Sequence, residues 1–105
     1  MVKIMQINNV VLCGIVLDNP RIKREGTISS CSLIIDYIIE HKSEERSKDY
    51  HTFIKCVFVG NLALDVFENV KKGNTILING KITNSTRNTL SDEHNFHIKC
   101  YSFSM

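Results

Sequence analysis

The chain has 105 residues with a formal net charge of +2, 43% hydrophobic residues and 23% charged residues. A chain of this length has room for one domain and one core, and it buries only about 60–70% of its unfolded surface, so self-association is expected to stabilise it. The composition is ordinary for a globular protein and indicates no long disordered tail, and no apolar run approaches the roughly 20 residues of a membrane-spanning helix. The small positive charge disfavours an acidic mimic of nucleic acid.

The cysteines are widely spaced, each within a strand-like run, and none forms a pair at the spacing of metal ligands: Cys13, Cys31, Cys56 and Cys100. The first residues lack the apolar core of a signal peptide, which favours reduced cytosolic thiols that act as small core hydrophobes over a disulfide-stapled secreted protein. An alternative to a core thiol at Cys100 is a metal site that this cysteine would form with His94 and His97. Strand alternation points the two histidines to opposite faces, which favours surface histidines and no cofactor.

The first predicted strand runs from Asn9 to Leu17, and every second residue from Val10 to Val16 shares one face. Gly14 in mid-strand is typical of a strand that coils sharply between the two sides of a small barrel. Pro20 ends the run because it has no N–H to donate.

A basic segment follows, from Arg21 to the turn glycine Gly26, and includes Lys23 and Arg24. Its composition fits a solvated hairpin arm and a phosphate-contacting arm equally well.

A long hairpin is predicted next. Ser30 to Glu40 is rich in β-branched residues, and Tyr50 to Val59 forms the return strand. The charged residues between them, His41 to Asp49, form a tip without apolar anchors, so we expect the tip to project from the barrel and to be mobile without a ligand. In the return strand, Ile54, Cys56 and Phe58 are predicted core residues, while Phe53, Lys55, Val57 and Val59 face outward.

A short helix follows the return strand. Its predicted apolar face consists of Ala63, Val66, Phe67 and Val70. Asn61 is the expected N-cap and Gly73 the left-handed C-cap. Lys71 and Lys72 before that glycine are explained by the helix dipole.

In the next strand, Ile76, Ile78 and Ile82 are predicted to point inward and Leu77, Asn79 and Lys81 outward. A polar loop with Arg87, Asn84 to His94, leads to a last strand, Phe96 to Phe103, with Phe96, Ile98 and Cys100 on one face. This order of five strands and one helix predicts an all-β fold. The expected fold is a five-stranded Greek-key oligonucleotide/oligosaccharide-binding (OB) barrel with one helix between strands three and four, in a single domain of residues 1–105.

Three stretches match a known pattern. Residues 8–20 read NNVVLCGIVLDNP against N-K-V-x-L-x-G-x-(L/V)-x-x-D-P, residues 31–35 read CSLII against F-S-L-A-T, and residues 60–80 fit G-K-L-A…K-K-G-x-x-(V/I)-x-(V/I)-x-G. The chain thereby resembles bacterial-type single-stranded DNA-binding proteins over residues 8–83. The resemblance implies a non-enzymatic OB-fold protein that forms homodimers or homotetramers. Such a protein covers single-stranded DNA without strong sequence preference during replication, recombination or repair, in the cytoplasm with the nucleoid.

The chain departs from this family at its stacking residues. The family's W-H-R-V-x-x-F-G-K reads FIKCVFVGN at residues 53–61, so an aromatic and a basic residue remain at Phe53 and Lys55. Val59 replaces the second aromatic, and Ile54 replaces a histidine associated with subunit contacts. Because stacking contributes about 1–3 kcal/mol per base, we expect weaker binding that depends more on phosphate contacts. The family's acidic-tipped tail, which recruits replication proteins, has no counterpart after Tyr101, so we expect DNA binding without recruitment of partners through a tail.

Alternative functions remain. The chain also resembles primosomal replication protein B, a short accessory protein of replication restart, in the sequence pattern at Cys31 and at Glu40-His41-Lys42-Ser43. An OB-fold protein-interaction module without nucleic-acid binding would explain the missing tryptophans. A nuclease is disfavoured because the acidic residues are scattered.

The predicted DNA path is mainly electrostatic. Its residues are Lys55 and Lys81 on the outer sheet face, Arg21, Lys23, Arg24, Lys42, Arg46, Lys48 and Arg87 on the loops, and Phe53, Tyr37 and Tyr50 for stacking. Outward apolar positions such as Val57, Val59 and Leu77 are the expected subunit contacts. The sequence leaves open whether RNA competes with DNA and which replication proteins are partners.

Overall fold

The fold is described from a computed structural model. The structure describes residues 6–42, 47–84 and 96–105, and only the backbone of residues 39–42 and 47–49. Within these ranges the elements are β1 (Val10–Val16), β2 (Arg21–Glu25), β3 (Ile28–Lys42), β4 (Ser47–Val59), α1 (Asn61–Asn69), β5 (Thr75–Asn84) and β6 (Phe96–Ser104). None of the helical residues described here forms a segment long and apolar enough to cross a membrane.

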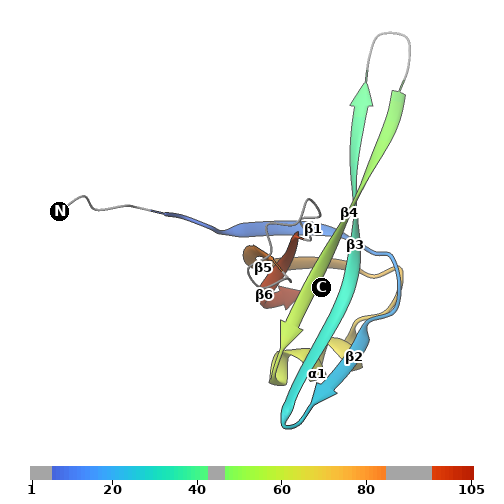
Figure 1. The fold of residues 1–105 in the computed structure, drawn as a ribbon. Helices are drawn as coiled ribbons and strands as arrows, with labels where there is room; N and C mark the ends of the chain where they lie inside the picture. Colours follow the sequence, from blue (N-terminus) through green and yellow to red (C-terminus); the bar gives the residue numbers. More distant parts are fainter. Residues whose placement is uncertain (1–5, 43–46, 85–95) are drawn as a thin grey trace, which may run out of the picture.

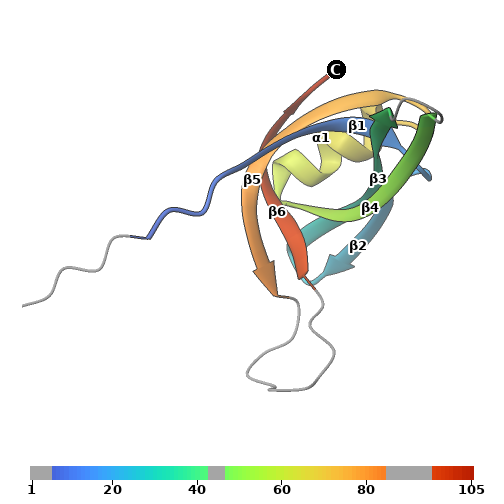
Figure 2. The same ribbon diagram turned by 90° about the horizontal axis from the view of Figure 1, so that it is seen from above.

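The strands form a closed barrel (Figure 1, Figure 2). Their order is β1-β5-β6-β4-β3-β2, and β1 also pairs with β3, which closes the sheet. The pairings are antiparallel except for that of β4 with β6, which is parallel. The barrel strands follow in the order β1, β3, β4, β5 and β6 with α1 after β4, which confirms the predicted OB fold. The basic segment, β2, pairs with β3 and extends the sheet as a hairpin arm.

Closure of the barrel depends on Gly14. β1 pairs with β5 from Val10 to Ile15 and with β3 at Ile15 and Val16. A Cβ atom at Gly14 would clash with Cγ2 of Ile35 and approach the carbonyl oxygen of Asp36 to 2.9 Å. The strand therefore needs glycine where the two sides of the barrel meet, as predicted from its position.

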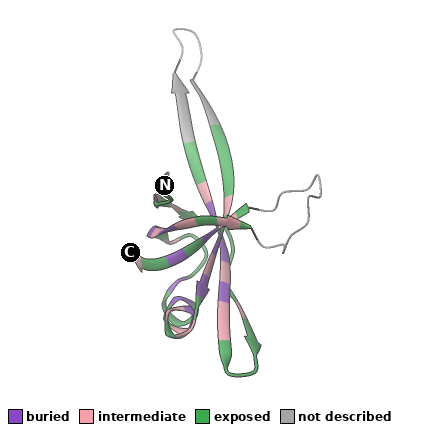
Figure 3. Ribbon diagram, turned by 60° about the vertical axis from the view of Figure 1, so that its left-hand side comes forward, coloured by how far each residue is buried: buried purple, intermediate pink, exposed green. Residues whose placement is uncertain are grey.

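The core fills the barrel and the space under α1, which lies across one end (Figure 2, Figure 3). The buried residues are Val16, Cys31, Leu33, Ile35, Cys56, Phe58, Ala63, Val66, Val70, Ile76, Ile78, Ile98 and Cys100. All cysteines are free, and burial raises the pKa of the Cys31 thiol to about 11. The expectation of core thiols holds for three cysteines and is wrong for Cys13, which is exposed because it alternates with the inward residues of β1.

The predicted helix ends were wrong. Gly60 is the N-cap, with φ of 75° and no side-chain capping bond, so Asn61 is already helical. The helix ends at Asn69, and Val70 after it is extended. Gly73 is therefore not the C-cap, although it does adopt a φ of 89°, in the turn before β5. Its N–H donates to the carbonyl oxygen of Val16 at 2.8 Å, which ties this turn to β1.

The helix dipole does not explain Lys71 and Lys72, because the last turn of α1 contains no basic residue. The Lys71 N–H donates to Oδ1 of Asn74 at 2.7 Å, and the Lys72 N–H donates to Oδ1 of Asn19 at 2.9 Å. Their backbone thus secures the turn while both side chains remain in solvent. Phe67, predicted on the apolar face, is 40% exposed at the margin of the helix interface.

Two residues predicted to point into the core are exposed: Ile82 is 49% exposed and Phe96 is 61% exposed. They are near neighbours at the far end of the β5–β6 pair, beyond a bulge at Asn79 and Gly80. This end is not covered by α1, so their side chains line an open hollow instead of a closed core.

The β3–β4 hairpin is longer than predicted and extends beyond the barrel (Figure 1). Its register runs from Ser30 opposite Val59 to Lys42 opposite Ser47. The expected mobility of the tip concerns residues 41–49, whose side chains lie outside the described part, and stays a prediction.

Candidate nucleic-acid interface

The outer face of β3 and β4 is set by their register. Residues directly opposite each other share a face, and Lys55 lies opposite Ile34 while Phe53 lies opposite Asp36. Phe53 is 61% exposed, and Lys55 is exposed as well. Both predicted contacts therefore lie on one solvent-facing surface of the hairpin.

Lysines continue this surface across the barrel. Val57 of β4 pairs with Lys99 of β6, and Lys99 pairs with Lys81 of β5. Lys55, Lys99 and Lys81, which we name the lysine row, thus lie on the same outer face of three neighbouring strands. Lys99 was missed from the sequence, although the inward positions of Ile98 and Cys100 on either side already indicate that it points outward.

The lysine row carries positive charge that no direct ion pair among the described residues neutralises. Lys81 and Lys99 are directly opposed, an arrangement that destabilises a sheet. No carboxylate among the described side chains forms an ion pair with any of the three lysines. A row of unpaired cations on a sheet face is an electrostatic footprint for a polyanion.

His97 lies beside this row and opposite Thr83. Burial, and then the positive charge of Lys55, lower the pKa of His97. The imidazole is half-buried, and its Nδ1 has no hydrogen-bond partner within the described residues. At neutral pH the ring is therefore neutral and adds no charge to the lysine row.

Two aromatic rings lie side by side on β4. The rings of His51 and Phe53 are stacked, with centroids 6.3 Å apart and an angle of 19° between their planes. Nδ1 of His51 is 3.0 Å from each carboxylate oxygen of Asp36, which holds the imidazole in place. His51 was not predicted as a site residue, but its position two residues before Phe53 puts it on the same face.

The tyrosines do not join this surface. Tyr37 lies opposite Thr52 and Tyr50 lies opposite Ile39, so both alternate onto the face that continues from the core residues Leu33 and Ile35. They are 39% and 48% exposed, respectively. The structure therefore separates them from Phe53 and Lys55.

The basic residues of β2 divide between two faces. Arg21 and Lys23 lie opposite Ser32 and Ser30 and share the outer face with Lys55, whereas Arg24 lies opposite Ser29 on the other face. Lys23 pairs with Glu25 at 2.9 Å; the hydrogen bond and charge between them raise the pKa of Lys23 and lower that of Glu25. This pairing supports the interpretation of the strand as a solvated arm.

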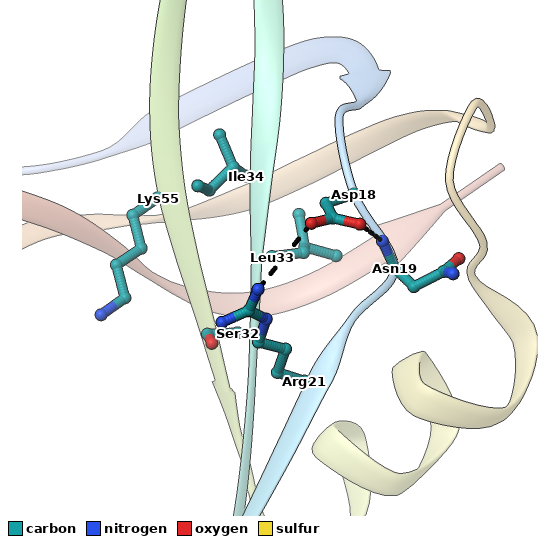
Figure 4. Close-up of a pocket in the computed structure, with 7 residues that line it drawn as sticks. All are labelled: Asp18, Asn19, Arg21, Ser32, Leu33, Ile34 and Lys55. Atoms are coloured by element: carbon teal, nitrogen blue, oxygen red, sulfur yellow. Dashed lines mark hydrogen bonds and ion pairs between the residues drawn. The ribbon is translucent and has the colours of Figure 1, made fainter.

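Arg21 lies closer to the lysine row. Its guanidinium Nη2 forms a long, exposed ion pair with Oδ2 of Asp18 at 3.9 Å. Arg21, Asp18 and Lys55 border a shallow hollow of about 290 Å³. Figure 4 shows the Arg21 side chain reaching over β3 beside Ser32, with Lys55 on the neighbouring strand. Arg21 can thus extend the positive surface to the edge of the sheet. The other predicted basic contacts lie outside the described side chains: Lys42, Arg46, Lys48 and Arg87.

A second hollow, of about 340 Å³, opens at the barrel end opposite α1, and we name it the barrel mouth. Its lining residues are Val10, Leu12, Phe53, Ile54, Lys55, Ile82, Phe96, His97 and Ile98. The mouth is largely apolar and shares Phe53 and Lys55 with the outer face. The described residues contain no group of three or more side chains suited to hold a metal ion. Of the three residues of the alternative metal site, His94 lies outside the described residues.

Known proteins share this architecture. The model of the single-strand binding protein family matches residues 7–101. A deletion mutant of the single-stranded DNA-binding protein from Thermus aquaticus superposes with a TM-score of 0.77 at 13% identity, over 93% of this chain and 49% of that one. The chain thus spans about half the length of that deletion mutant. The small single-stranded DNA-binding protein from Streptomyces coelicolor gives a TM-score of 0.75 at 14% identity, over 95% and 93% of the two chains. A comparison with curated protein sequences found no match.

Proposed function

The chain belongs to the single-strand binding protein family, and we propose that it binds single-stranded DNA across the outer face of β3, β4, β6 and β5. The lysine row contacts phosphates, and the paired rings of Phe53 and His51 stack against bases. Proteins of this family bind DNA and are not enzymes.

The observation that carries the proposal is the lysine row. Lys55, Lys99 and Lys81 lie on adjacent strands, with two of them directly opposed and none paired with a described carboxylate. Bound phosphates would relieve this repulsion, and counterion release from a single strand contributes about −0.7 to the slope of log K against log salt for each contact. Stacking on Phe53 adds a contribution that depends little on salt or sequence.

The biological setting belongs to the same proposal. We expect the chain to act as one OB-fold domain in DNA replication, recombination or repair, as a homodimer or homotetramer in the cytoplasm. Free, largely buried thiols support a reducing compartment. RNA is an alternative ligand because the lysine row recognises phosphates that both nucleic acids carry.

The test is a fluorescence-anisotropy titration of oligo(dT) at about 50 mM and 200 mM salt. The double variant Lys81→Ala/Lys99→Ala is expected to bind more weakly and to flatten the salt slope by about 0.7 for each phosphate that these lysines neutralise in the parent. Phe53→Ala should instead cost about 1–3 kcal/mol at nearly unchanged slope.

A matched control is Lys71→Ala/Lys72→Ala, which removes the same charge from the exposed turn after α1. Its salt slope should stay closer to that of the parent. If the parent shows no salt-dependent binding, the protein-interaction module replaces this proposal. If both double variants behave alike, the DNA does not follow the lysine row.

A further inference from the structure

Asp36 is an unexpected residue for a surface that binds a polyanion. Among the described side chains on the outer face of β3 to β6 it is the one carboxylate. Its neighbours along β3 on this face, Ile34 and Ile38, are apolar and 38% and 42% exposed. Asp36 holds the imidazole of His51 in place, but a carboxylate repels phosphate, so its position beside the lysine row opposes polyanion binding unless it also takes part in ligand recognition.

Asp36 is held in place but retains capacity to accept hydrogen bonds. Both of its oxygens lie 3.0 Å from Nδ1 of His51. An ionised carboxylate offers about four lone-pair sites, so one imidazole N–H leaves most of them free. The side chain is 15% exposed, which makes it accessible from the outer face while neighbouring side chains shield it from most water.

Phe53 determines where a base would lie relative to this carboxylate. Phe53 and Asp36 are directly opposed in the register, and such pairs have Cβ atoms about 4.5–5.5 Å apart. The imidazole of His51 stacks against the exposed ring of Phe53 and bonds to the carboxylate of Asp36. The stacking surface and the carboxylate therefore contact the same side chain. A base stacked on Phe53 therefore has an edge within reach of Asp36.

We propose that Asp36 makes this interface selective among bases, favouring guanine and cytosine over thymine. Guanine presents its N1–H and N2 amino group side by side and cytosine presents its N4 amino group, and a carboxylate accepts hydrogen bonds from such donors. Thymine offers one N–H flanked by two carbonyl oxygens, which the carboxylate repels. The inference rests on the proposed function and adds base preference to it.

The experiment compares the affinity of the protein for labelled oligo(dC) and oligo(dT) of equal length at one salt concentration. Because one good contact to a base edge discriminates by about 1 kcal/mol or more, oligo(dC) should bind about 5-fold or more tightly. An oligo(dT) with interspersed guanines should also bind more tightly than oligo(dT). Replacing those guanines by inosine, which lacks the N2 amino group, should reduce that gain in the unaltered protein.

The variant Asp36→Asn replaces one acceptor oxygen by an amide donor, so it should abolish or reverse the preference for cytosine over thymine. Glu68→Gln removes the same charge from an exposed position on α1 and should leave the preference unchanged. Equal affinity of the parent for all four oligonucleotides, or an unchanged preference in folded Asp36→Asn, would overturn the inference alone. Absence of binding to every oligonucleotide would overturn the proposed function together with it. If Asp36→Asn fails to fold, the inosine comparison decides.

Discussion

His97 places a titratable group beside the lysine row. Its ring is half-buried beside Lys55, and Lys99 and Lys81 lie on the same outer face. Burial and Lys55 both disfavour the imidazolium, which lowers the pKa of His97 in the folded protein. Protonation of this residue is therefore coupled to the stability of the face on which the proposed interface lies.

The expected consequence is a loss of stability in acid. Because the unfolded chain binds a proton at His97 more readily than the folded chain, the stabilisation is present above the ordinary histidine pKa and is lost as the pH falls through the lower folded value. Thermal unfolding of the parent and of His97→Gln should be compared between about pH 7.5 and pH 5. The variant should lose less stability over this range, and an equal loss would show that His97 does not contribute.

At the scale of the elements, alternation within a strand could be read from the sequence, whereas pairing between strands could not. Inward positions such as Cys56 and Ile78 follow a period of two residues, and they are buried as predicted. The opposition of Lys99 to Lys81 depends on which strands meet and in what register, which no local pattern specifies.

The wrong predictions of burial and of the helix ends have the same cause, which is contact between distant segments of the chain. Ile82 continues the inward alternation of β5 but extends past the part of the barrel that α1 covers, so its side chain is half exposed. The helix ends were missed because Gly60 takes the N-cap position with its positive φ, and the turn residues bond to Asn19 and Val16 on a distant segment. Tertiary contacts determine these positions, and local sequence does not.

β1 offers a direct test of barrel closure. In Gly14→Ala the new methyl group would meet Cγ2 of Ile35 and the backbone of Asp36, and the backbone cannot move aside without opening the β1–β3 pairing. We expect destabilisation of about 1–3 kcal/mol from overpacking, measured by urea unfolding. The neighbouring, exposed Cys13→Ala is the control and should change stability by less than about 0.5 kcal/mol. Unfolding of Gly14→Ala at the same urea concentration as the parent would contradict this account of closure.

At the scale of the whole molecule, exposed apolar residues gather on the outer face of β1 and β5. Val11 is 62% exposed, and Ile15 and Leu77 are each 41% exposed. Exposed Cys13 lies directly opposite Leu77, so these residues form one surface, which we name the β1–β5 patch. Of the outward positions expected to contact another subunit, Leu77 belongs to this patch, whereas Val57 lies between Lys55 and Lys99 on the proposed DNA path.

The β1–β5 patch is the expected contact between subunits, because a small barrel gains most from covering apolar surface that its own core does not use. Light scattering should show a dimer or tetramer at micromolar concentration. Leu77→Glu buries a charge in that contact and should shift the population towards monomer. Ile28→Glu, at a position 61% exposed beside the β2–β3 turn, introduces the same charge away from the patch and should leave the assembly intact. A parent protein that is monomeric, or a Leu77→Glu variant that assembles as the parent does, would assign the patch another role.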